Sequence, residues 1–301
     1  MIVNYNGVKD TLECLDSLDK AAHIGIKAVF IVIDNRSELN ELSIIAKHQT
    51  APVCIQNETN LGFVGASNQG ITAALNLGVE FVLLLNNDTV VSSSFLTELL
   101  SCAKSQSIGL IGPKILYHAR PDYIQSAGGK IIWDIGYIHD VGSNKQNSPK
   151  YSLPYLPDWV SGCAILVRRQ VFDRISLLDG DLSFAGEDID FAVRARAAGF
   201  KALFCPTAVV WHKVAKTRQV LSRRTKTYTR FEPRGPKLFE KYQGSLCKHL
   251  RVTRLCYLVV IRPIAALEFM FLTRDPQLRL YYCKRAILAL LSFDGVTHSA
   301  F

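Results

Sequence analysis

Short apolar runs alternate with amphipathic stretches along the first hundred residues. The runs are apolar at successive positions, which is typical of strands buried on both faces of a parallel sheet. The stretches between them carry apolar residues at helical spacing. This alternation predicts right-handed βαβ units and an α/β fold with a mostly parallel sheet flanked by helices. The expected strands are residues 2–5, 28–34, 53–56 and 81–86, and the expected helices are residues 10–22, 38–48, 66–77 and 94–104.

The pattern changes after residue 104. Strand-like segments come closer together, and a loop at 142–157 is rich in Asn, Ser, Lys and Pro. A loop of that length is uncommon in a compact domain, so it is either disordered or functional. A helix is expected to begin near Glu187 and to end at about Ala198, before Gly199. The further expected strands are residues 108–113, 129–138, 160–167, 202–205 and 209–211.

Charge divides the chain into a mildly acidic body and a basic C-terminal third. The chain has 301 residues, of which 49% are apolar, and can bury a sizeable core. Residues 212–301 hold 18 Lys and Arg against 5 Asp and Glu, a net charge of +13, whereas residues 1–211 hold 17 against 21, a net charge of −4. A basic segment suits nucleic acid, an anionic membrane surface or a phosphorylated substrate.

The eight cysteines have neither a Cys-x-x-Cys motif nor regular spacing. Most lie in apolar stretches, where cysteine behaves as a small hydrophobic residue. We expect reduced thiols in a cytoplasmic protein, with no structural zinc. No signal peptide is apparent, because the chain opens on a strand-like segment; the first strand is either very short or begins upstream of Met1.

Two of the expected buried strands end in a carboxylate, at Asp34 and just beyond Asn87 at Asp88. Ligands of open α/β sheets bind beyond the carboxyl ends of the strands. The alternative for either residue is a helix N-cap, a position that aspartate favours. Two such residues on strands expected to be near neighbours favour a bound ligand.

Residues 60–70 contain three glycines and two asparagines between an expected strand and helix. The plain alternative is a flexible turn that starts the helix. The segment does not match G-x-G-x-x-G, and the chain has no Walker A motif. A dinucleotide-dependent dehydrogenase and a P-loop NTPase are therefore disfavoured.

Glu187, Asp188 and Asp190 lie within one turn at the start of an expected helix. The helix dipole favours acids there, and Asp190 is spaced to pair with Arg194. A remaining carboxylate is a candidate general base. His212 follows an apolar segment and is either a histidine at the edge of the core or a neutral metal ligand.

Short polar segments follow these strands in a fixed order, at residues 3–6, 32–37, 60–63, 68–70, 84–88 and 186–190. The set resembles the inverting family 2 glycosyltransferases, and within them the rhamnosyltransferase-like branch that builds bacterial cell-surface polysaccharides. The resemblance covers about residues 1–215. It implies a GT-A fold, a nucleotide-diphosphate sugar donor of dTDP or UDP type, and a divalent cation, Mg or Mn. The expected domains are a catalytic domain at 1–215 and a basic, largely helical region at 216–301.

The resemblance also implies a role for each matching residue. Asp34 would accept the N3–H of uracil or thymine. Asp188, beside Glu187, would be the catalytic base, and Asp88 and His212 would hold the metal. Trp159 is expected to stack on a pyranose ring. The residues implied along the nucleotide sugar are Asn4, Tyr5, Asn6, Asp34, Asn60, Gly62, Asn68, Asn86, Asn87, Asp88, Trp159 and Gly162.

One position departs from the family pattern. The first residue of the family's D-x-D metal motif is Asn86 here, an uncharged amide. Metal binding then depends more on Asp88 and on the diphosphate itself. Mg and Mn suit such a site, because they are commonly held by one or two carboxylates and substrate phosphates.

The basic C-terminal third contains an apolar stretch at residues 255–272, interrupted by Arg262, Pro263 and Glu268. These interruptions make it a poor transmembrane helix, so we expect an interfacial helix beside anionic lipids. The alternative is a helical subdomain packed on the core or on a second copy, which leaves a homo-oligomer open. The resemblance implies a glycan or polyprenyl-diphosphate-linked acceptor and attachment to the inner face of the cytoplasmic membrane.

Other functions fit the sequence less well. A sugar nucleotidyltransferase usually opens on a Gly-rich G-x-G-T-R-like loop, which the chain lacks. A degenerate, inactive membrane-assembly subunit is disfavoured because Asp34, Asp88, Asp188 and His212 are all present. Nucleic-acid binding ranks last, because no recognised module accompanies the basic segment.

Overall fold

The computed structural model describes residues 1–21, 25–132, 137–182, 186–214 and 241. The chain forms two compact units, residues 1–130 with 139–215, and residues 131–138 with 216–301. All the site residues predicted from the sequence belong to the first unit. The expected basic region at 216–301, including the predicted interfacial helix, lies outside the described residues except for Lys241.

The first part of the chain forms a parallel sheet with helices as crossovers, as the apolar runs predict. Its four strands lie in the order β3-β2-β1-β4, and each pair is parallel. Each strand-to-strand connection contains one helix, so this part is a succession of βαβ units. The elements are β1 (Ile2–Asn4), α1 (Val8–Ala21), β2 (Ile31–Asp34), α2 (Leu42–Ile45), β3 (Val53–Gln56), α3 (Gly62–Asn76) and β4 (Phe81–Asn86).

The second part extends the same sheet in the order β4-β10-β6-β11-β5. β10 is antiparallel to both neighbours, β11 is parallel to β6, and β7 adds an antiparallel strand beside β6. β8 and β9 form a separate two-stranded sheet. The elements are β5 (Thr89–Val91), α4 (Phe95–Cys102), β6 (Ile108–Tyr117), β7 (Arg120–Ser126), β8 (Gly129–Ile132), β9 (Tyr137–Asp140), η1 (Pro149–Tyr151), β10 (Ala164–Arg168), α5 (Arg169–Ile175), α6 (Glu187–Ala197) and β11 (Lys201–His212).

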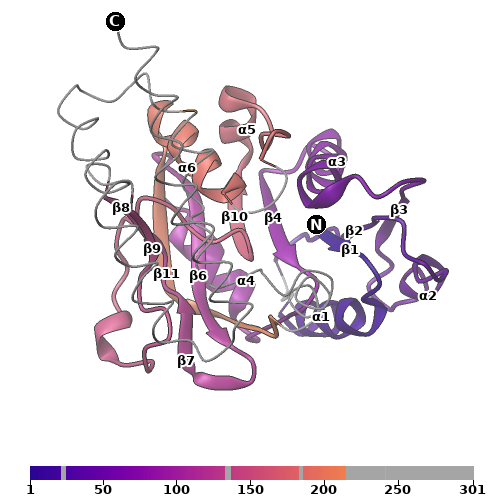
Figure 1. The fold of residues 1–301 in the computed structure, drawn as a ribbon, viewed down its shortest axis with the longest axis horizontal. Helices are drawn as coiled ribbons and strands as arrows, with labels where there is room; N and C mark the ends of the chain where they lie inside the picture. Colours follow the sequence, from indigo (N-terminus) through magenta and orange to yellow (C-terminus); the bar gives the residue numbers. More distant parts are fainter. Residues whose placement is uncertain (22–24, 133–136, 183–185, 215–240, 242–301) are drawn as a thin grey trace, which may run out of the picture. The chain divides into compact units, whose positions relative to one another are not determined.

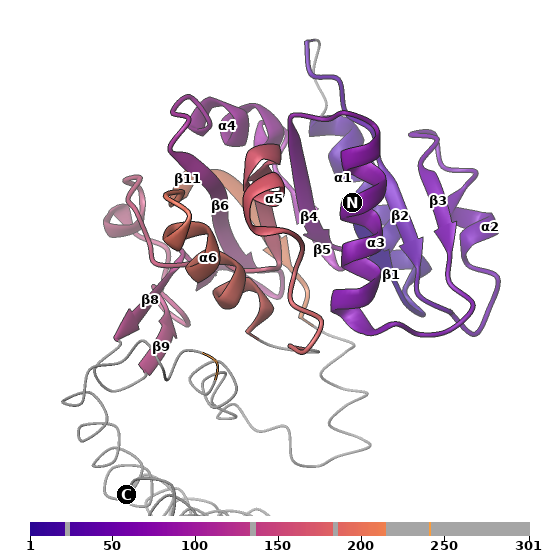
Figure 2. The same ribbon diagram turned by 90° about the horizontal axis from the view of Figure 1, so that it is seen from above.

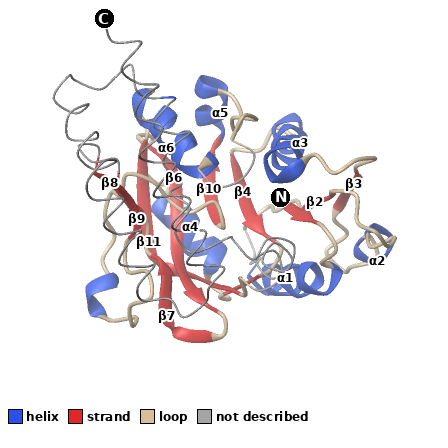
Figure 3. Ribbon diagram, viewed as in Figure 1, coloured by secondary structure: helices blue, strands red, loops and turns tan. Residues whose placement is uncertain are grey.

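Helices cover both faces of the main sheet (Figures 1 and 3). α1, α2 and α4 lie on one face, where α1 contacts both of the other helices. α3, α5 and α6 lie on the other face, which is nearer the viewer in Figure 2. One core cluster packs the first face and includes Leu15, Phe95 and Ile111. The mostly parallel α/β sheet with helices on both faces confirms the predicted fold class.

The structure corrects several predicted boundaries. α2 has one turn instead of the expected helix at 38–48, because the chain before it forms polar turns around the end of β2. The two strands expected at 202–205 and 209–211 form one strand, β11, whose irregularity after Cys205 looked like a break in the sequence. The strand expected at 129–138 becomes parts of β8 and β9. β5, β7 and α5 were not predicted, since each is short or lacks a clear apolar period.

Within the described residues, no helix is long and apolar enough to cross a membrane.

Candidate active site

The carboxyl ends of β2, β1 and β4 meet at one edge of the sheet, because β1 pairs in parallel with both neighbours. Asn4 lies opposite Asp34 in this register, and Val3 lies opposite Asn86. One strand therefore separates the two strand ends that carry Asp34 and Asp88. Parallel strands place their terminal polar residues together in this way, as the sequence predicted.

Asp34 is buried and fully engaged within the protein. Asp34 is 1% exposed. One carboxylate oxygen accepts from Asn4 Nδ2 at 2.7 Å and Ser37 Oγ at 2.5 Å, and the other accepts from Ser37 N at 3.1 Å and Gln56 Nε2 at 2.7 Å. Asp34 therefore closes the turn after β2 and does not cap a helix. Gln56 is exposed, so it is the donor that a ligand would displace most easily.

Glu41 is a second buried carboxylate at this edge, and the sequence analysis missed it. One of its oxygens, Oε2, accepts from Asn4 Nδ2 at 2.8 Å, Gly7 N at 2.9 Å and Val8 N at 3.1 Å. The last two donors stand at the N-terminus of α1, where a negative charge is favourable. Asn4 is thus held between Asp34 and Glu41 and is 0% exposed. The structure places Asn4 as a support for the site, with no face open to a ligand.

The same network reaches the turn that carries the predicted metal ligand. Thr11 Oγ1 donates to Asn4 Oδ1 at 2.7 Å, and Asn87 Nδ2 donates to Thr11 Oγ1 at 3.2 Å. Gly7 is required for this packing, because an added Cβ would lie 2.6 Å from Asn87 Nδ2. The end of β1 and the turn after β4 are therefore joined by side chains on α1.

Tyr5 and Asn6 follow β1 and lie at the surface of this edge. The Tyr5 residue is 49% exposed, so its ring is accessible to a ligand. Asn6 has a positive φ of 50°, and its amide oxygen accepts the Glu38 N–H at 2.8 Å. Asn6 therefore holds the turn after β2 against the turn after β1 and leaves Tyr5 exposed.

Asn60 and Asn68 act mainly within the protein. Asn60 Oδ1 accepts from Gly62 N at 2.8 Å and from Asn35 Nδ2 at 2.9 Å, at the start of α3. Gly62 itself has a φ of +71°, which only glycine adopts readily. Asn68 exchanges two hydrogen bonds with the backbone of Leu178, so it ties α3 to the loop after α5.

Asp88 contacts His212 at the end of β4. Asp88 Oδ1 lies 3.0 Å from His212 Nε2, and the Asp88 side chain is 22% exposed. β5 begins directly after Asp88, so this carboxylate cannot be a helix cap. The backbone reinforces the contact, because the Lys213 N–H donates to the Asp88 carbonyl oxygen at 2.9 Å. The two residues predicted to hold a metal are therefore side by side.

Gln125 on β7 orients the His212 ring and was not predicted. Its Oε1 lies 2.8 Å from His212 Nδ1. An amide oxygen only accepts, so Nδ1 carries a hydrogen and Nε2 faces Asp88. Burial lowers the pKa of His212, but the side chains of Cys163 and Asp88 raise it by more, to about 10. Without a metal, His212 is therefore the cationic partner of Asp88.

Asp188 lies at the start of α6 against the segment before β10. Its Oδ2 accepts the Gly162 N–H at 2.8 Å, and its Oδ1 accepts its neighbour's N–H, from Ile189, at 2.9 Å. Gly162 is needed for this approach, because an added Cβ would lie 3.3 Å from the Asp188 Cβ. Glu187 is buried beside it. The carboxylate of Asp188 is thus fixed in place by backbone N–H groups.

Asp190 has the structural role that its spacing suggested. Its Oδ2 lies 2.7 Å from Arg194 Nε, and Asp190 is 0% exposed. Arg194 also donates to the carbonyl oxygens of Ile175 and Leu177. This ion pair fixes α6 to the loop after α5, which leaves Asp188 as the candidate base.

The structure places Trp159 differently from the expectation. Trp159 is 0% exposed, and its ring lies where a Cβ on Gly129 would be. A ring that stacks on a sugar needs an accessible face, so Trp159 is a core residue that packs the segment before β10 onto β8. We therefore leave Trp159 out of the proposed sugar-binding residues.

The residues present suit a divalent cation that is shared with a ligand. Asp88 and His212 offer one oxygen and one nitrogen close together at the sheet edge. In the described part of the chain, no three or more His, Cys, Asp and Glu side chains group as a metal site. The remaining ligands of Mg or Mn would be phosphate oxygens and water, as is usual for these ions.

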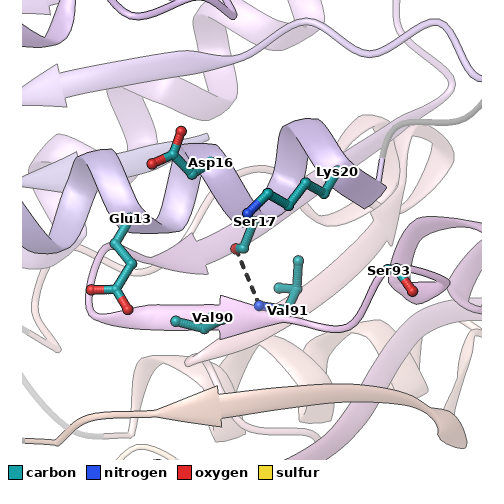
Figure 4. A pocket seen from close by; sticks show the side chains of 7 residues that line it. All are labelled: Glu13, Asp16, Ser17, Lys20, Val90, Val91 and Ser93. Carbon is teal, nitrogen blue, oxygen red and sulfur yellow. Dashed lines mark hydrogen bonds between the residues drawn. The ribbon is translucent and has the colours of Figure 1, made fainter.

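A shallow depression of about 290 Å³ lies elsewhere in the same unit, between α1 and β5 (Figure 4). Side chains of both signs line it, and Ser17 Oγ accepts the Val91 N–H at 3.2 Å there. None of the residues predicted for the site contributes to it. Its lining residues are Glu13, Asp16, Ser17, Lys20, Val90, Val91 and Ser93.

Two curated relatives match much of this chain. A hexosyltransferase of low-salt glycan biosynthesis, Agl10 of Haloferax volcanii, is 27% identical over 199 residues, which cover 65% of this chain and 60% of the relative. An uncharacterized protein of Mycobacterium bovis is 27% identical over 199 residues, covering 63% of this chain and 66% of the relative. The chain thus spans less than two thirds of either relative.

The fold is similar to that of solved glycosyltransferases. GalNAc-T7, crystallised with UDP, GalNAc and Mn2+, superposes with a TM-score of 0.58 at 18% identity, covering 84% of this chain and 55% of that one. This confirms the expected GT-A-like fold. The family described as "Glycosyltransferase like family 2" matches residues 1–230 of the 301. The chain therefore belongs to the family 2-like glycosyltransferases.

Proposed function

We propose that this chain is an inverting, metal-dependent glycosyltransferase that moves a sugar from a nucleotide-diphosphate donor to a hydroxyl of a glycan or lipid-linked acceptor. The observation that carries the proposal is the Asp88–His212 contact at 3.0 Å. It joins β4 to the end of β11 at the sheet edge where Asp34 also lies. One carboxylate and one imidazole at this edge suit a cation that is shared with a diphosphate.

Asp34 is the proposed base-binding residue. The N3–H of uracil or thymine would replace the exposed Gln56 amide on the Asp34 carboxylate, whose other three bonds keep it in place. Tyr5, which is exposed beside it, would cover one face of the base. Both bases present the same N3–H, so this arrangement suits UDP and dTDP donors alike.

Asp88 and His212 are the proposed ligands of Mg or Mn. The bound cation would act as a Lewis acid that offsets the charge developing on the leaving diphosphate. Gln125 would keep His212 Nε2 directed at the cation, as partners of metal-bound histidines do. The Asn86 amide would contribute a neutral contact, with no charge to bind the cation.

Asp188 is the proposed catalytic base. It would take the proton of the acceptor hydroxyl while that oxygen attacks the anomeric carbon from the face opposite the diphosphate. The Gly162 and Ile189 N–H groups each hold one carboxylate oxygen, and the acceptor hydroxyl would donate to a remaining lone pair of this fixed carboxylate. Direct displacement of this kind inverts the anomeric configuration.

The biological setting is also part of the proposal. The relative from Haloferax volcanii acts in glycan biosynthesis, and this supports a role in cell-surface polysaccharide synthesis, with rhamnose as one candidate sugar. The basic composition of residues 216–301 supports peripheral attachment to an anionic membrane on the cytoplasmic side. Binding of the full chain to anionic vesicles at low salt and release at high salt test this attachment. No binding at low salt refutes it.

A thermal-shift screen of nucleoside diphosphates and sugar nucleotides, with and without Mn2+, tests the proposed function. A ligand that binds the folded state raises the melting temperature according to its affinity. We expect stabilisation by UDP- or dTDP-type ligands, increased by Mn2+. Stabilisation by NAD or ATP with none by any sugar nucleotide contradicts the proposal. Asp34→Asn, beside Asp16→Asn as an exposed control, is expected to weaken nucleoside binding while pyrophosphate binding persists.

A further inference from the structure

Lys114 is a buried lysine in the middle of β6 without a counter-charge. It is 6% exposed, and each of the eight other residues from Ile108 to Leu116 is also buried. Among the residues that the structure describes, none forms a hydrogen bond or ion pair with its ammonium group. Burial accordingly lowers the pKa of Lys114. A lysine whose side chain is largely removed from water, with no carboxylate partner among the described residues, is costly, so a purely structural role would favour an apolar residue here.

The strand register places Lys114 in line with the turn that carries Asp88. β10 pairs antiparallel with both β4 and β6, with Leu166 opposite Leu83 on one side and Ile111 on the other. β4 and β6 therefore run parallel, and Asn86 and Lys114 each follow three residues after this row. The Asn86 N–H donates to the Cys163 carbonyl oxygen at 2.9 Å. Neighbouring strands are about 4.8 Å apart, so β4 and β6 lie about 10 Å apart where both pair with β10.

Side-chain alternation places Asn86 and Lys114 on one face of the sheet. Leu85, Ala164 and Ile111 pack in the core cluster on the side of α1 and α4. Successive residues of a strand point to opposite faces, so Asn86 and Lys114 are directed to the side of α6. Asp188 of α6 is bonded to Gly162, the residue next to Cys163. Lys114 therefore lies at the level of the end of β4, and its side chain is directed to the face on which α6 carries the proposed base.

The charges of the proposed site leave room for one more cation. A divalent cation bound to the Asp88 carboxylate cannot balance the charge of a departing nucleoside diphosphate by itself. Asn86, where the family motif has a carboxylate, adds no charge of either sign. The ammonium group of Lys114 would supply the missing positive charge if a phosphate lay within reach of its side chain. Lysine binds phosphate as a point charge.

We propose that Lys114 is an anion-binding residue of this site and that its partner is a phosphate oxygen of a bound substrate. This inference deepens the proposed transferase function and rests on it. The phosphate has two sources, the diphosphate of the donor or the phosphate of a lipid-linked acceptor. The chemistry at Lys114 is the same for both.

Replacing Lys114 by methionine separates this role from a structural one. Lys114→Met keeps the length of the side chain and removes an uncompensated charge, so urea unfolding is expected to show stability equal to or above that of the wild type. Calorimetry is expected to show about 10–100-fold weaker binding of UDP and of pyrophosphate, and unchanged binding of uridine. Lys114→Arg keeps the charge and is expected to retain most of the affinity. Lys104→Met, an exposed lysine, is the matched control and should change nothing.

The outcomes distinguish the donor diphosphate from the acceptor phosphate as the partner of Lys114. They also separate the role of Lys114 from the proposed transferase function. UDP and pyrophosphate binding that is unchanged in Lys114→Met, together with a lower kcat/KM for a diphosphate-linked acceptor but not for an unphosphorylated one, assigns Lys114 to the acceptor. Unchanged binding and unchanged transfer to both acceptors overturn the inference. A wild type that binds pyrophosphate through Lys114 but no nucleotide contradicts the proposed function and leaves Lys114 an anion-binding residue. Should Lys114→Met fail to fold, Lys114→Gln provides the same comparison.

Discussion

The polar groups around Asp34 and Glu41, the nucleotide end of the proposed site, differ in their partners from those around Asp88, His212 and Asp188, the reaction end. At the nucleotide end, Asp34 and Glu41 accept hydrogen bonds from neutral amides, hydroxyls and backbone N–H groups of residues 4–56. At the reaction end, the Asp88 carboxylate faces a histidine from the far end of the domain. The first end is therefore complete without a ligand. At the second end, the proposed cation would replace the proton between His212 and Asp88.

The difference predicts which variants damage stability and which damage chemistry. Groups at the nucleotide end stabilise the fold through buried hydrogen bonds, so removing one leaves others unsatisfied. Groups at the reaction end are partly exposed or held by backbone contacts, so their replacement should affect catalysis and metal binding more than folding. The following predictions test this division, from the largest expected effect to the smallest.

Replacing Asp188 by asparagine should produce the largest change at the reaction end. The amide oxygen of the new side chain can still accept the Gly162 N–H, so the fold is expected to persist, but the group can no longer take a proton. A positioned general base contributes about 10²–10⁴-fold, and we expect kcat to fall by that factor with nucleotide affinity unchanged. Steady-state kinetics and nucleotide titration measure both. Asp173→Asn removes an exposed carboxylate from α5 and serves as control; normal turnover in the Asp188→Asn variant excludes Asp188 as the base.

Replacing Glu41 by leucine should damage the nucleotide end through stability. The change removes the acceptor of Asn4, Gly7 and Val8, and we expect the free energy of unfolding to fall by about 3 kcal/mol. Urea unfolding measures it. Glu38→Leu, on the same loop but exposed, should change the value by less than about 0.5 kcal/mol. Equal losses in the two variants mean that Glu41 does not support this end of the site.

Gln125 offers a finer test of the reaction end. Gln125→Leu removes the acceptor of His212 Nδ1, and we expect Mn2+ affinity to fall about 10–100-fold, the usual effect of losing such a partner. Gln125→Glu keeps an acceptor and should bind Mn2+ as well as the wild type does. Electron paramagnetic resonance of free Mn2+ gives both constants. Identical affinities in the leucine and glutamate variants would show that Gln125 does not orient His212.

The smallest expected effect is the pH dependence of the metal-free protein. The pKa of His212 is raised to about 10 in the folded state, above its ordinary value of 6.5. The interactions of His212 with Cys163 and Asp88 therefore contribute their full stability below pH 6.5 and lose it as the pH rises towards 10. With a chelator present, the stability advantage of the wild type over His212→Gln should be larger at about pH 6 than at about pH 9.5. An advantage that grows with pH contradicts the pairing.

Much of the nucleotide end follows from the sequence because it is local. The strands that carry Asn4, Asp34 and Asp88 are continuous apolar runs, and parallel βαβ connections bring their ends together. Glu41 was not predicted, because its partners are Asn4 and the N-terminus of α1. No pattern in the sequence indicates that Glu41 contacts these residues. The family resemblance placed Asn68 and Trp159 in the ligand site, whereas in the structure Asn68 is hydrogen-bonded to Leu178 and Trp159 is buried.

Single residues of the reaction end were candidates from the sequence, but only the family resemblance joined Asp88, Gly162, Asp188 and His212 into one site, and it did not include Gln125. Asp88, Gln125, Gly162, Asp188 and His212 lie on five separate segments, and β7, which carries Gln125, had no clear strand pattern. Lys114 lies within an apolar strand, and the sequence analysis did not single it out. Which residues lie level with it on the neighbouring strands follows only from the strand pairing. Pairing between distant strands determines these neighbours, and a single sequence does not record it.

The most direct test of the account is the effect of Mn2+ on nucleoside diphosphate binding by the wild type and by Asp88→Asn. Asparagine keeps the shape of the side chain and removes its charge, so folding should be unaffected. The account predicts that Mn2+ tightens UDP or dTDP binding by at least about tenfold in the wild type and by little in the variant. Equal tightening in both proteins would contradict the claim that Asp88 and His212 hold the cation for the donor diphosphate.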